Sequence, residues 1–289
     1  RDAVAAALRT GYRLIDTALY YNTEHDIAAG IRLAGLSRSD VFIATKVLQK
    51  AHASEQQVRA SLRESLRNLG TDFVDLYLIH NPRAGRIKEV WSLLLRLREE
   101  GLVRAVGVSN FGVGQLEGIR NAGLEMPEVN QIEVHCWRQL PEVVEYHRCH
   151  GIATMCMAPL ARCRMLGRSD LGAIARELGR TEPEVAIRWL LQKGYIPIPK
   201  SINPARIEEN TASGFDLPED IMARIDKLDS GYMSCTMASP CHELDWNLVA
   251  EDIPHPDTWG GGRRSGKAKG GGKGGGHHKG SPTVPSWWE

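Results

Sequence analysis

Long apolar runs and an excess of charge of one sign are both missing from this sequence. No apolar stretch approaches the roughly 18 residues that suggest a membrane span. The formal net charge is +1, so no overall field favours nucleic acid or a membrane surface. With 42% hydrophobic and 25% charged residues the composition is that of an ordinary globular protein. We therefore expect neither specific nucleic-acid binding nor membrane association.

Cysteine pairs are also missing, since none of the six cysteines belongs to a C-x-x-C motif. In a chain of 289 residues such cysteines are typical of reduced thiols in an intracellular protein, and we predict a cytoplasmic location. One candidate metal cluster consists of Cys235, Cys241 and His242, but the spacing is poor and a fourth ligand is not evident. We predict no metal site.

Acidic residues are absent from residues 260–280, where glycine runs alternate with lysines and arginines. Such a segment cannot bury enough apolar area to offset its chain entropy. His277 and His278 within it are better explained as part of a solvated tail than as a metal site. The sequence therefore predicts a folded domain over residues 1–259 and a disordered basic tail over residues 260–289.

Apolar runs alternate with amphipathic helices along the first part of the chain. Residues 54–69 illustrate the helices, with Ser54 as N-cap and Gly70 as the stop signal. Short links between such units imply right-handed crossovers and a parallel sheet with both faces covered. The runs interpreted as strands are residues 13–18, 41–47, 73–79, 103–108, 129–134, 152–157 and 195–199.

A closed barrel of this type has eight strands, and the sequence supplies seven. The predicted fold class is therefore an α/β (β/α)8 TIM barrel that lacks its first strand, which would precede Arg1. Residues 2–8 already form a predicted helix. We interpret it as one cut off from an upstream segment, in preference to a transit peptide, or else as the start of a degenerate barrel.

Four polar residues follow the first three predicted strands. Asp16 ends the first, Tyr21 lies five residues later, Lys46 ends the second and His80 follows the third. The carboxyl ends of barrel strands meet at one rim, where such folds build their active sites. Each residue alone is better explained as a cap, a packing residue or a surface cation. Their joint placement favours a catalytic site.

These four side chains suit the addition of a hydride and a proton to a carbonyl group. A phenol is a poor proton donor at neutral pH unless its pKa falls, and a nearby ammonium lowers it. We expect Lys46 to do this for Tyr21, with Asp16 holding the lysine charged and oriented. His80 can hydrogen-bond the carbonyl oxygen.

The chain resembles the aldo-keto reductases, including the 2,5-diketo-gluconate reductase-like and aldose reductase-like members. The resemblance rests on GYRLIDTA followed by YNTE, on ATK, on DLYLIH, and on GVSNF, NQ and IPKS. It covers roughly residues 4–231. Asp16, Tyr21, Lys46 and His80 fall on the catalytic positions of that family. The resemblance implies reduction of an aldehyde or ketone to an alcohol, by a protein that is commonly a monomer.

The resemblance also implies NADPH as cofactor, bound at the strand ends without the usual dinucleotide fingerprint. Residues 112–118 are indeed off-spacing for G-x-G-x-x-G. Independently of the family, a lysine and an arginine six residues apart can bracket a phosphate. By resemblance, Ser109, Asn110 and Gln131 hold the nicotinamide amide, Lys200, Ser201 and Arg206 grip the 2′-phosphate, and Glu209 and Asn210 face the adenine.

Three positions depart from the family pattern. Met157 stands where a tyrosine usually stacks on the nicotinamide, and its soft sulfur makes a weaker contact. Asn81 replaces the usual tryptophan after the histidine, and Trp137 follows Cys136 where a Pro-aromatic pair is usual. We expect Asn81 and Trp137 to line the substrate pocket. The alternatives to a reductase are an inactive nucleotide-binding or regulatory barrel and a truncated product.

Overall fold

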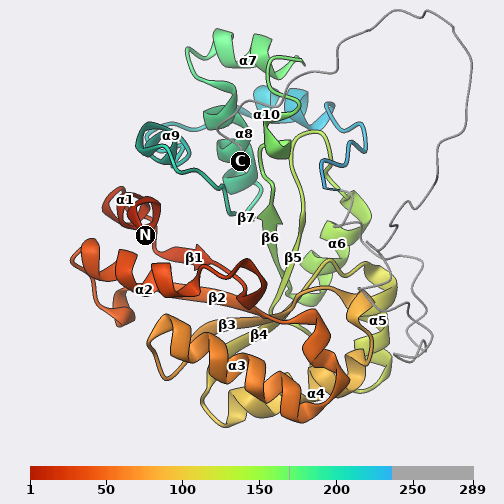
Figure 1. Cartoon of the computed structure of the whole chain (residues 1–289). Helices are drawn as coiled ribbons and strands as arrows, with labels where there is room; N and C mark the ends of the chain where they lie inside the picture. The colour runs from red at the N-terminus through yellow and green to blue at the C-terminus, as the bar shows by residue number, and fades with distance from the viewer. Residues whose placement is uncertain (169, 236–289) are drawn as a thin grey trace, which may run out of the picture.

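The computed structural model describes residues 1–168 and 170–235. Their centre is a curled sheet of seven parallel strands in sequential order, β1 to β7 (Figure 1). The strands are β1 (Leu14–Asp16), β2 (Phe42–Val47), β3 (Val74–Ile79), β4 (Val103–Ser109), β5 (Val129–Glu133), β6 (Ala153–Met157) and β7 (Ile196–Pro197). The predicted order of seven parallel strands, with the first barrel strand lacking, is confirmed.

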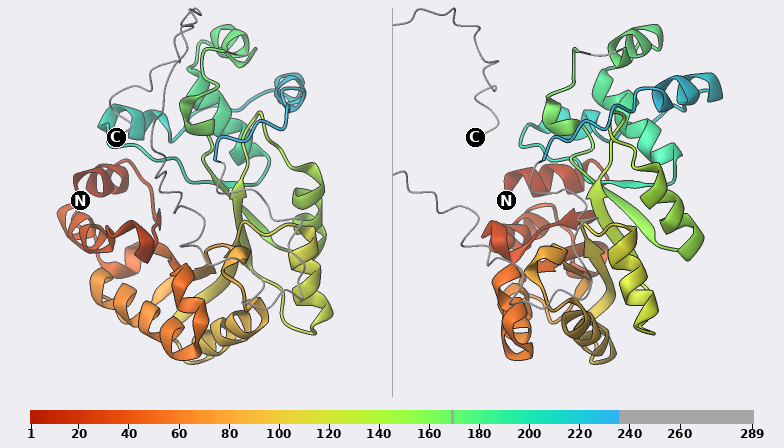
Figure 2. Two further views of the ribbon diagram at one scale, coloured as in Figure 1. Left: turned by 45° about the vertical axis from the view of Figure 1, so that its right-hand side comes forward. Right: turned by 90° about the vertical axis from the view of Figure 1, so that its right-hand side faces the viewer.

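Helices cover the outer face of this sheet (Figure 2). Helix α3 begins after Ser54, whose hydroxyl accepts the amide hydrogen of Gln57, and ends at Gly70 in the left-handed conformation, as the sequence predicts. The α-helices are α1 (Asp2–Arg9), α2 (Glu24–Leu33), α3 (Glu55–Leu69), α4 (Ile87–Glu99), α5 (Val113–Asn121), α6 (Pro141–His150), α7 (Leu171–Glu177), α8 (Glu182–Gln192), α9 (Pro204–Glu209) and α10 (Glu219–Asp226). None of the described helices is long and apolar enough to cross a bilayer.

Short 3-10 turns follow several strands at the rim. They are η1 (Leu19–Tyr21), η3 (Gln49–Ala53), η4 (Pro82–Ala84) and η5 (Ala161–Cys163), whereas η2 (Arg38–Asp40) precedes β2. β7 is shorter than predicted because Pro197 and Pro199 carry no amide hydrogen for a strand ladder. The predicted domain boundary after residue 259 and the tail lie outside the described residues.

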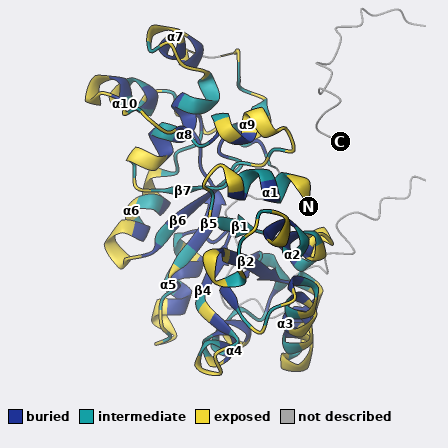
Figure 3. Cartoon of the chain, turned by 90° about the vertical axis from the view of Figure 1, so that its left-hand side faces the viewer, coloured by how far each residue is buried: buried dark blue, intermediate teal, exposed yellow. Residues whose placement is uncertain are grey.

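Apolar packing on both faces of the sheet holds the strand ends in place. The outer face packs against α2–α5 through residues such as Ile43, Tyr77 and Trp91, which are fully buried. Ala44, Leu76, Leu78 and Met155 form the layer on the concave face. In Figure 3 the strands are buried while the outward sides of the helices are exposed. Both faces are thus covered, as expected for a parallel sheet.

Candidate active site

The period of two along a strand places the polar residues at the rim on the concave face. Lys46 lies two residues after Ala44, and His80 lies two residues after Leu78, so each shares the face of a core residue. Asp16 pairs in register with Ala44 across β1 and β2. Tyr21 is the last residue of η1, the turn that follows β1. The local geometry therefore brings residues from three strand ends to one place.

The catalytic residues predicted from the sequence do lie together. Lys46 Nζ donates to both carboxylate oxygens of Asp16 at 2.8 and 2.7 Å, and to the carbonyl oxygen of Thr17 at 2.8 Å. The same ammonium lies 5.3 Å from the ring centroid of Tyr21. The Tyr21 and His80 rings meet edge to face with centroids 5.9 Å apart. One phenol, one ammonium, one carboxylate and one imidazole thus share a single cluster.

The pKa of Tyr21 differs in direction from the sequence prediction. Desolvation raises the pKa of this phenol, and the nearby Asp16 carboxylate and the Cys235 thiol raise it further. The reason is that the Lys46 charge is matched by Asp16 at hydrogen-bonding distance, so the pair does little to stabilise a phenolate. Tyr21 is therefore a protonated phenol at neutral pH, the form that can donate a proton.

His80 is a neutral imidazole at neutral pH. Burial, followed by the positive charge of Lys46 and by His52, lowers the pKa of His80 to about 3. A neutral imidazole carries one N–H and can donate a hydrogen bond to a carbonyl oxygen without bringing a second charge beside Lys46.

Acid should destabilise the fold through three histidines whose pKa values are lowered in the folded protein. Burial lowers the pKa of His52 and of His147 to about 4, as it lowers that of His80 to about 3. The unfolded chain therefore binds more protons than the folded one between pH ~6.5 and those values. We expect the free energy of unfolding to fall as the pH drops through this window, by up to ~1.4 kcal/mol per pH unit and histidine. Urea unfolding at pH 7 and pH 5 measures this, and an unchanged midpoint would contradict it.

The next two strand ends supply amide and hydroxyl groups. Ser109 Oγ donates to the carbonyl oxygen of Gln131 at 3.0 Å and accepts from Asn110 Nδ2 at 3.0 Å. Gln131 Nε2 donates to Asp16 at 2.7 Å, which joins these residues to the catalytic cluster. Asn110 adopts a left-handed backbone with φ 64°, and its buried Oδ1 has no partner among the described residues. An unpaired buried acceptor at this rim suits a ligand that brings an N–H donor.

A cavity of ≈ 770 Å³ opens beside the cluster. Asp16, Tyr21 and Gln131 line one part of it, and the remaining wall comes mainly from α1, the start of α2, and the segments after β6 and β7. Of the residues predicted to contact a cofactor, Met157, Lys200, Ser201 and Asn210 also line this cavity. The structure therefore brings two predicted nicotinamide contacts, Gln131 and Met157, into one continuous space with predicted phosphate and adenine contacts from the segment after β7.

Two further predicted cofactor contacts, Arg206 and Glu209, belong to the short helix α9 and do not line this cavity. The charges of both residues affect the pKa of Cys163, which lines the cavity. Burial raises this pKa, the positive charge of Arg206 lowers it, and the negative charge of Glu209 raises it. Their side chains are therefore near the cavity wall, although neither residue lines the space itself.

The two predicted substrate-binding residues lie differently. Asn81 is buried, and its side chain accepts the amide hydrogen of Arg83 at 2.9 Å, which caps η4. Trp137 is buried in the apolar cluster that joins β5 and β6 to α8 and α10, with its ring 5.8 Å from that of His135. Among the described residues, neither of the two lines the large cavity. Their role in substrate binding stays a prediction.

Three further residues were not identified from the sequence. Thr17 contributes a backbone oxygen to Lys46, and Cys235 lines the cavity beside Tyr21. Glu133 is fully buried at the end of β5. The period of two beyond Gln131 was a signal that could have placed Glu133 on the concave face. No local pattern connects Cys235 to this site, because it arrives from far along the chain.

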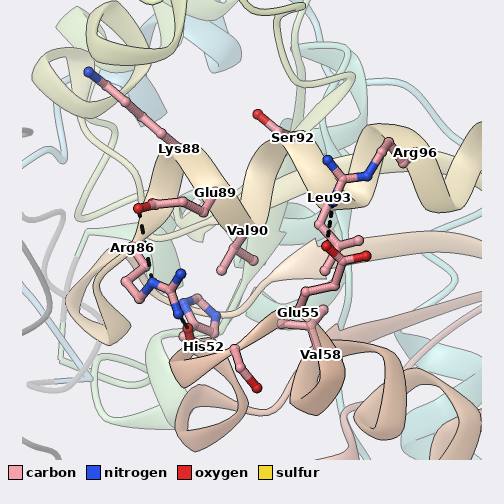
Figure 4. Close-up of a pocket in the computed structure, with 11 residues that line it drawn as sticks. His52, Glu55, Val58, Arg86, Lys88, Glu89, Val90, Ser92, Leu93 and Arg96 are labelled. Atoms are coloured by element: carbon pink, nitrogen blue, oxygen red, sulfur yellow. Dashed lines mark hydrogen bonds and ion pairs between the residues drawn. The ribbon is translucent and has the colours of Figure 1, made fainter.

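A second cavity, of ≈ 420 Å³, lies between the starts of α3 and α4 (Figure 4). Its charged side chains pair with one another: Arg96 contacts Glu55 at 2.8 Å and Arg86 contacts Glu89 at 4.0 Å. The first pair joins α4 to α3, and the second lies within the start of α4. In residues 1–168 and 170–235, no three His, Cys, Asp or Glu side chains gather into a group that could hold a metal.

Comparison with known proteins gives a consistent result. Residues 1–230 match the model of the Aldo/keto reductase family. An uncharacterized oxidoreductase of Bacillus subtilis is 40% identical over 233 residues, which are 79% of this chain and 83% of that protein. A glyoxal reductase of the same organism is 37% identical over 229 residues, again 79% and 83% of the two chains.

A solved structure agrees with these sequence matches. The Bombyx mori aldo-keto reductase in complex with NADP superimposes with a TM-score of 0.75 and 31% identity, covering 82% of this chain and 85% of that one. The family match extends over most of the chain and includes Asp16, Tyr21, Lys46 and His80. The chain therefore belongs to the aldo/keto reductase family, the oxidoreductases that reduce aldehydes or ketones.

Proposed function

We propose that this protein reduces an aldehyde or ketone to an alcohol with NADPH as the hydride donor and Tyr21 as the proton donor. The observation that carries the proposal is the cluster of Tyr21, Lys46, Asp16 and His80, of which Tyr21 and Asp16 line one cavity. A protonated phenol beside a neutral imidazole offers two hydrogen-bond donors to a carbonyl oxygen.

The residues of the cavity fit a nicotinamide dinucleotide. Lys200 and Ser201 line the cavity and offer a phosphate a cation and a hydroxyl, and beside it the unpaired Oδ1 of Asn110 suits the N–H of a carboxamide. NADPH would supply the hydride. Ser109, Asn110 and Gln131 would hold the nicotinamide amide, Met157 would contact the ring, Lys200, Ser201 and Arg206 would hold the 2′-phosphate, and Glu209 and Asn210 would face the adenine.

The contacts within the cluster suggest a separate role for each of the four side chains. His80 orients the carbonyl oxygen, and Tyr21 transfers its phenolic proton to that oxygen as the carbon receives the hydride. The Lys46 ammonium, 5.3 Å from the centroid of the Tyr21 ring, stabilises the phenolate that develops. Asp16 keeps the lysine in place. Each group acts without leaving the position that its strand end gives it.

The direct test is to follow NADPH oxidation by absorbance with a panel of carbonyls that includes glyoxal, the compound that names one relative. Turnover with NADPH supports the proposal. Cofactor binding without turnover of any carbonyl would favour an inactive nucleotide-binding barrel, and loss of both would favour a truncated product.

Cofactor preference gives a second prediction, at the far end of the cavity. We expect Lys200→Ala combined with Arg206→Ala to raise KM for NADPH by about 10- to 100-fold, because two cations facing a phosphate contribute ~1–3 kcal/mol together. KM for NADH should change by less than about 3-fold, since NADH lacks the 2′-phosphate. Steady-state kinetics with both cofactors measure the ratio. An equal rise in KM for NADPH and for NADH would show that Lys200 and Arg206 do not bind the 2′-phosphate.

A further inference from the structure

The buried carboxylate of Glu133 collects donors from two places far apart in the sequence. Ser234 donates to Glu133 Oε1 through its amide at 2.7 Å and through its hydroxyl at 2.5 Å. The amide of Cys235 donates to Oε2 at 3.2 Å, and His135 Nε2 lies 3.1 Å from Oε1. We call the hydrogen bonds from Ser234 and Cys235 the Glu133 clasp. It joins the end of β5 to the segment that follows α10.

This arrangement suits an ionised carboxylate and little else. A carboxylate only accepts hydrogen bonds, and here four donors converge on its two oxygens. Burial alone would raise the pKa of Glu133, but the hydrogen bonds from His135 and Ser234 lower it below its ordinary value. An amide in this place would turn an NH2 group toward at least one N–H donor.

The clasp is the last of several contacts that guide the segment toward the catalytic cavity. The amides of Ser230 and Tyr232 donate to the carbonyl oxygen of Trp137 at 3.2 and 2.9 Å. Arg164 then contacts the carbonyl oxygen of Ser234 at 3.4 Å. The segment thus runs along the chain that follows β5 and ends, within the described residues, at Cys235.

Cys235 forms part of the cavity wall beside the phenol. It lines the same space as Asp16 and Tyr21, and its thiol is one of the groups that raise the pKa of Tyr21. The carboxylate itself contributes no lining atom to the cavity, since Glu133 is fully buried. Any effect of Glu133 on a bound carbonyl therefore passes through the segment that it holds.

We propose that Glu133 is a positioning residue: its clasp holds residues 230–235 so that Cys235 forms part of the cavity wall, and that wall sets how tightly carbonyl substrates bind beside Tyr21. The role as a substrate wall rests on the proposed reductase function. The holding of the segment does not, and it can be measured in the protein without cofactor or substrate.

Glu133→Gln is the variant that tests this, because it keeps the size of the side chain and removes the acceptor-only carboxylate. We expect iodoacetamide to alkylate Cys235 about tenfold faster in this variant, because a lost hydrogen bond to a buried charge is worth ~1.5 kcal/mol or more. Peptide mass spectrometry follows the site, with buried Cys156 as the internal reference in the same samples. KM for benzaldehyde should rise by about tenfold while kcat changes by less than about threefold.

Asp75→Asn is the matched control. Asp75 is another buried carboxylate with several donors, from Arg38 at 2.6 Å, Arg104 at 2.9 Å and the amide of Ile43 at 2.8 Å. It lies near the start of β3, at the opposite end of the strand from His80. This variant should lose stability without changing the alkylation of Cys235 or KM for benzaldehyde.

Ser234→Ala keeps the proposal testable if Glu133→Gln fails to fold. It removes only the hydroxyl donor of the clasp and should accelerate alkylation of Cys235 by about threefold, a smaller effect in the same direction. Unchanged alkylation in both variants, or equal changes in Asp75→Asn, would overturn the proposal. If the wild-type protein turned over no carbonyl, the reductase function would fail while the alkylation result still decided whether the clasp holds the segment.

Discussion

Replacing Tyr21 by phenylalanine should lower kcat for aldehyde reduction by about 10²- to 10⁴-fold, the usual contribution of a positioned general acid. The ring, its edge-to-face contact with His80 and its contact with Lys46 all survive the change, because only the hydroxyl is lost. NADPH binding should therefore persist, which fluorescence titration measures. Stopped-flow single-turnover experiments would show that the loss lies in the chemical step.

Tyr20→Phe is the matched control for this variant. Tyr20 belongs to the same 3-10 turn, and its ring lies 6.3 Å from both the Tyr21 and the His80 rings. Its side chain is 68% exposed, and it does not line the cavity. We expect this variant to retain kcat within about threefold, as is usual for surface substitutions. A Tyr21→Phe enzyme with the wild-type rate, or a Tyr20→Phe enzyme equally impaired, would refute the assignment of the proton donor.

The strand ends of this fold could be predicted from the sequence because they follow a local rule. Apolar runs of the right length mark buried strands, and a polar residue at the end of each run marks the rim. Asp16, Lys46 and His80 satisfy that rule, and the structure brings them together. Tyr21 lies on a turn, η1, that periodicity alone does not define, and it is identified through the resemblance of its motif to the family.

The parts that could not be predicted depend on contacts between distant segments. The upward direction of the Tyr21 pKa shift depends first on how deeply the phenol is buried and then on how near the Asp16 carboxylate lies, and a sequence gives neither. The cap that the Asn81 side chain forms on the following turn was not part of the sequence prediction, and its role in substrate binding stays a prediction. Cys235 lines the cavity, and the segment that carries it is hydrogen-bonded to Glu133, about a hundred positions earlier.

Lys46→Met should damage both activity and stability. The lysine is nearly fully buried and makes three hydrogen bonds, two to Asp16 and one to Thr17. Without it the Asp16 carboxylate keeps Gln131 as a donor at 2.7 Å but loses its counter-charge. Removing one partner of a buried ion pair typically costs ~3–5 kcal/mol, and we expect a loss of the free energy of unfolding near the lower value because Asp16 is partly exposed. Urea unfolding measures it.

Asp16→Asn in the Lys46→Met background separates the two effects. The double variant no longer leaves a carboxylate without its partner, so it should regain about 2 kcal/mol of the lost stability. It should not regain turnover, which we expect to stay at least about 100-fold below wild type, because the ammonium that faces the developing phenolate is still missing. Recovery of activity together with stability would mean that Lys46 serves the fold alone. Recovery of stability without activity would mean that the charge of Lys46, and not its packing, takes part in the chemistry.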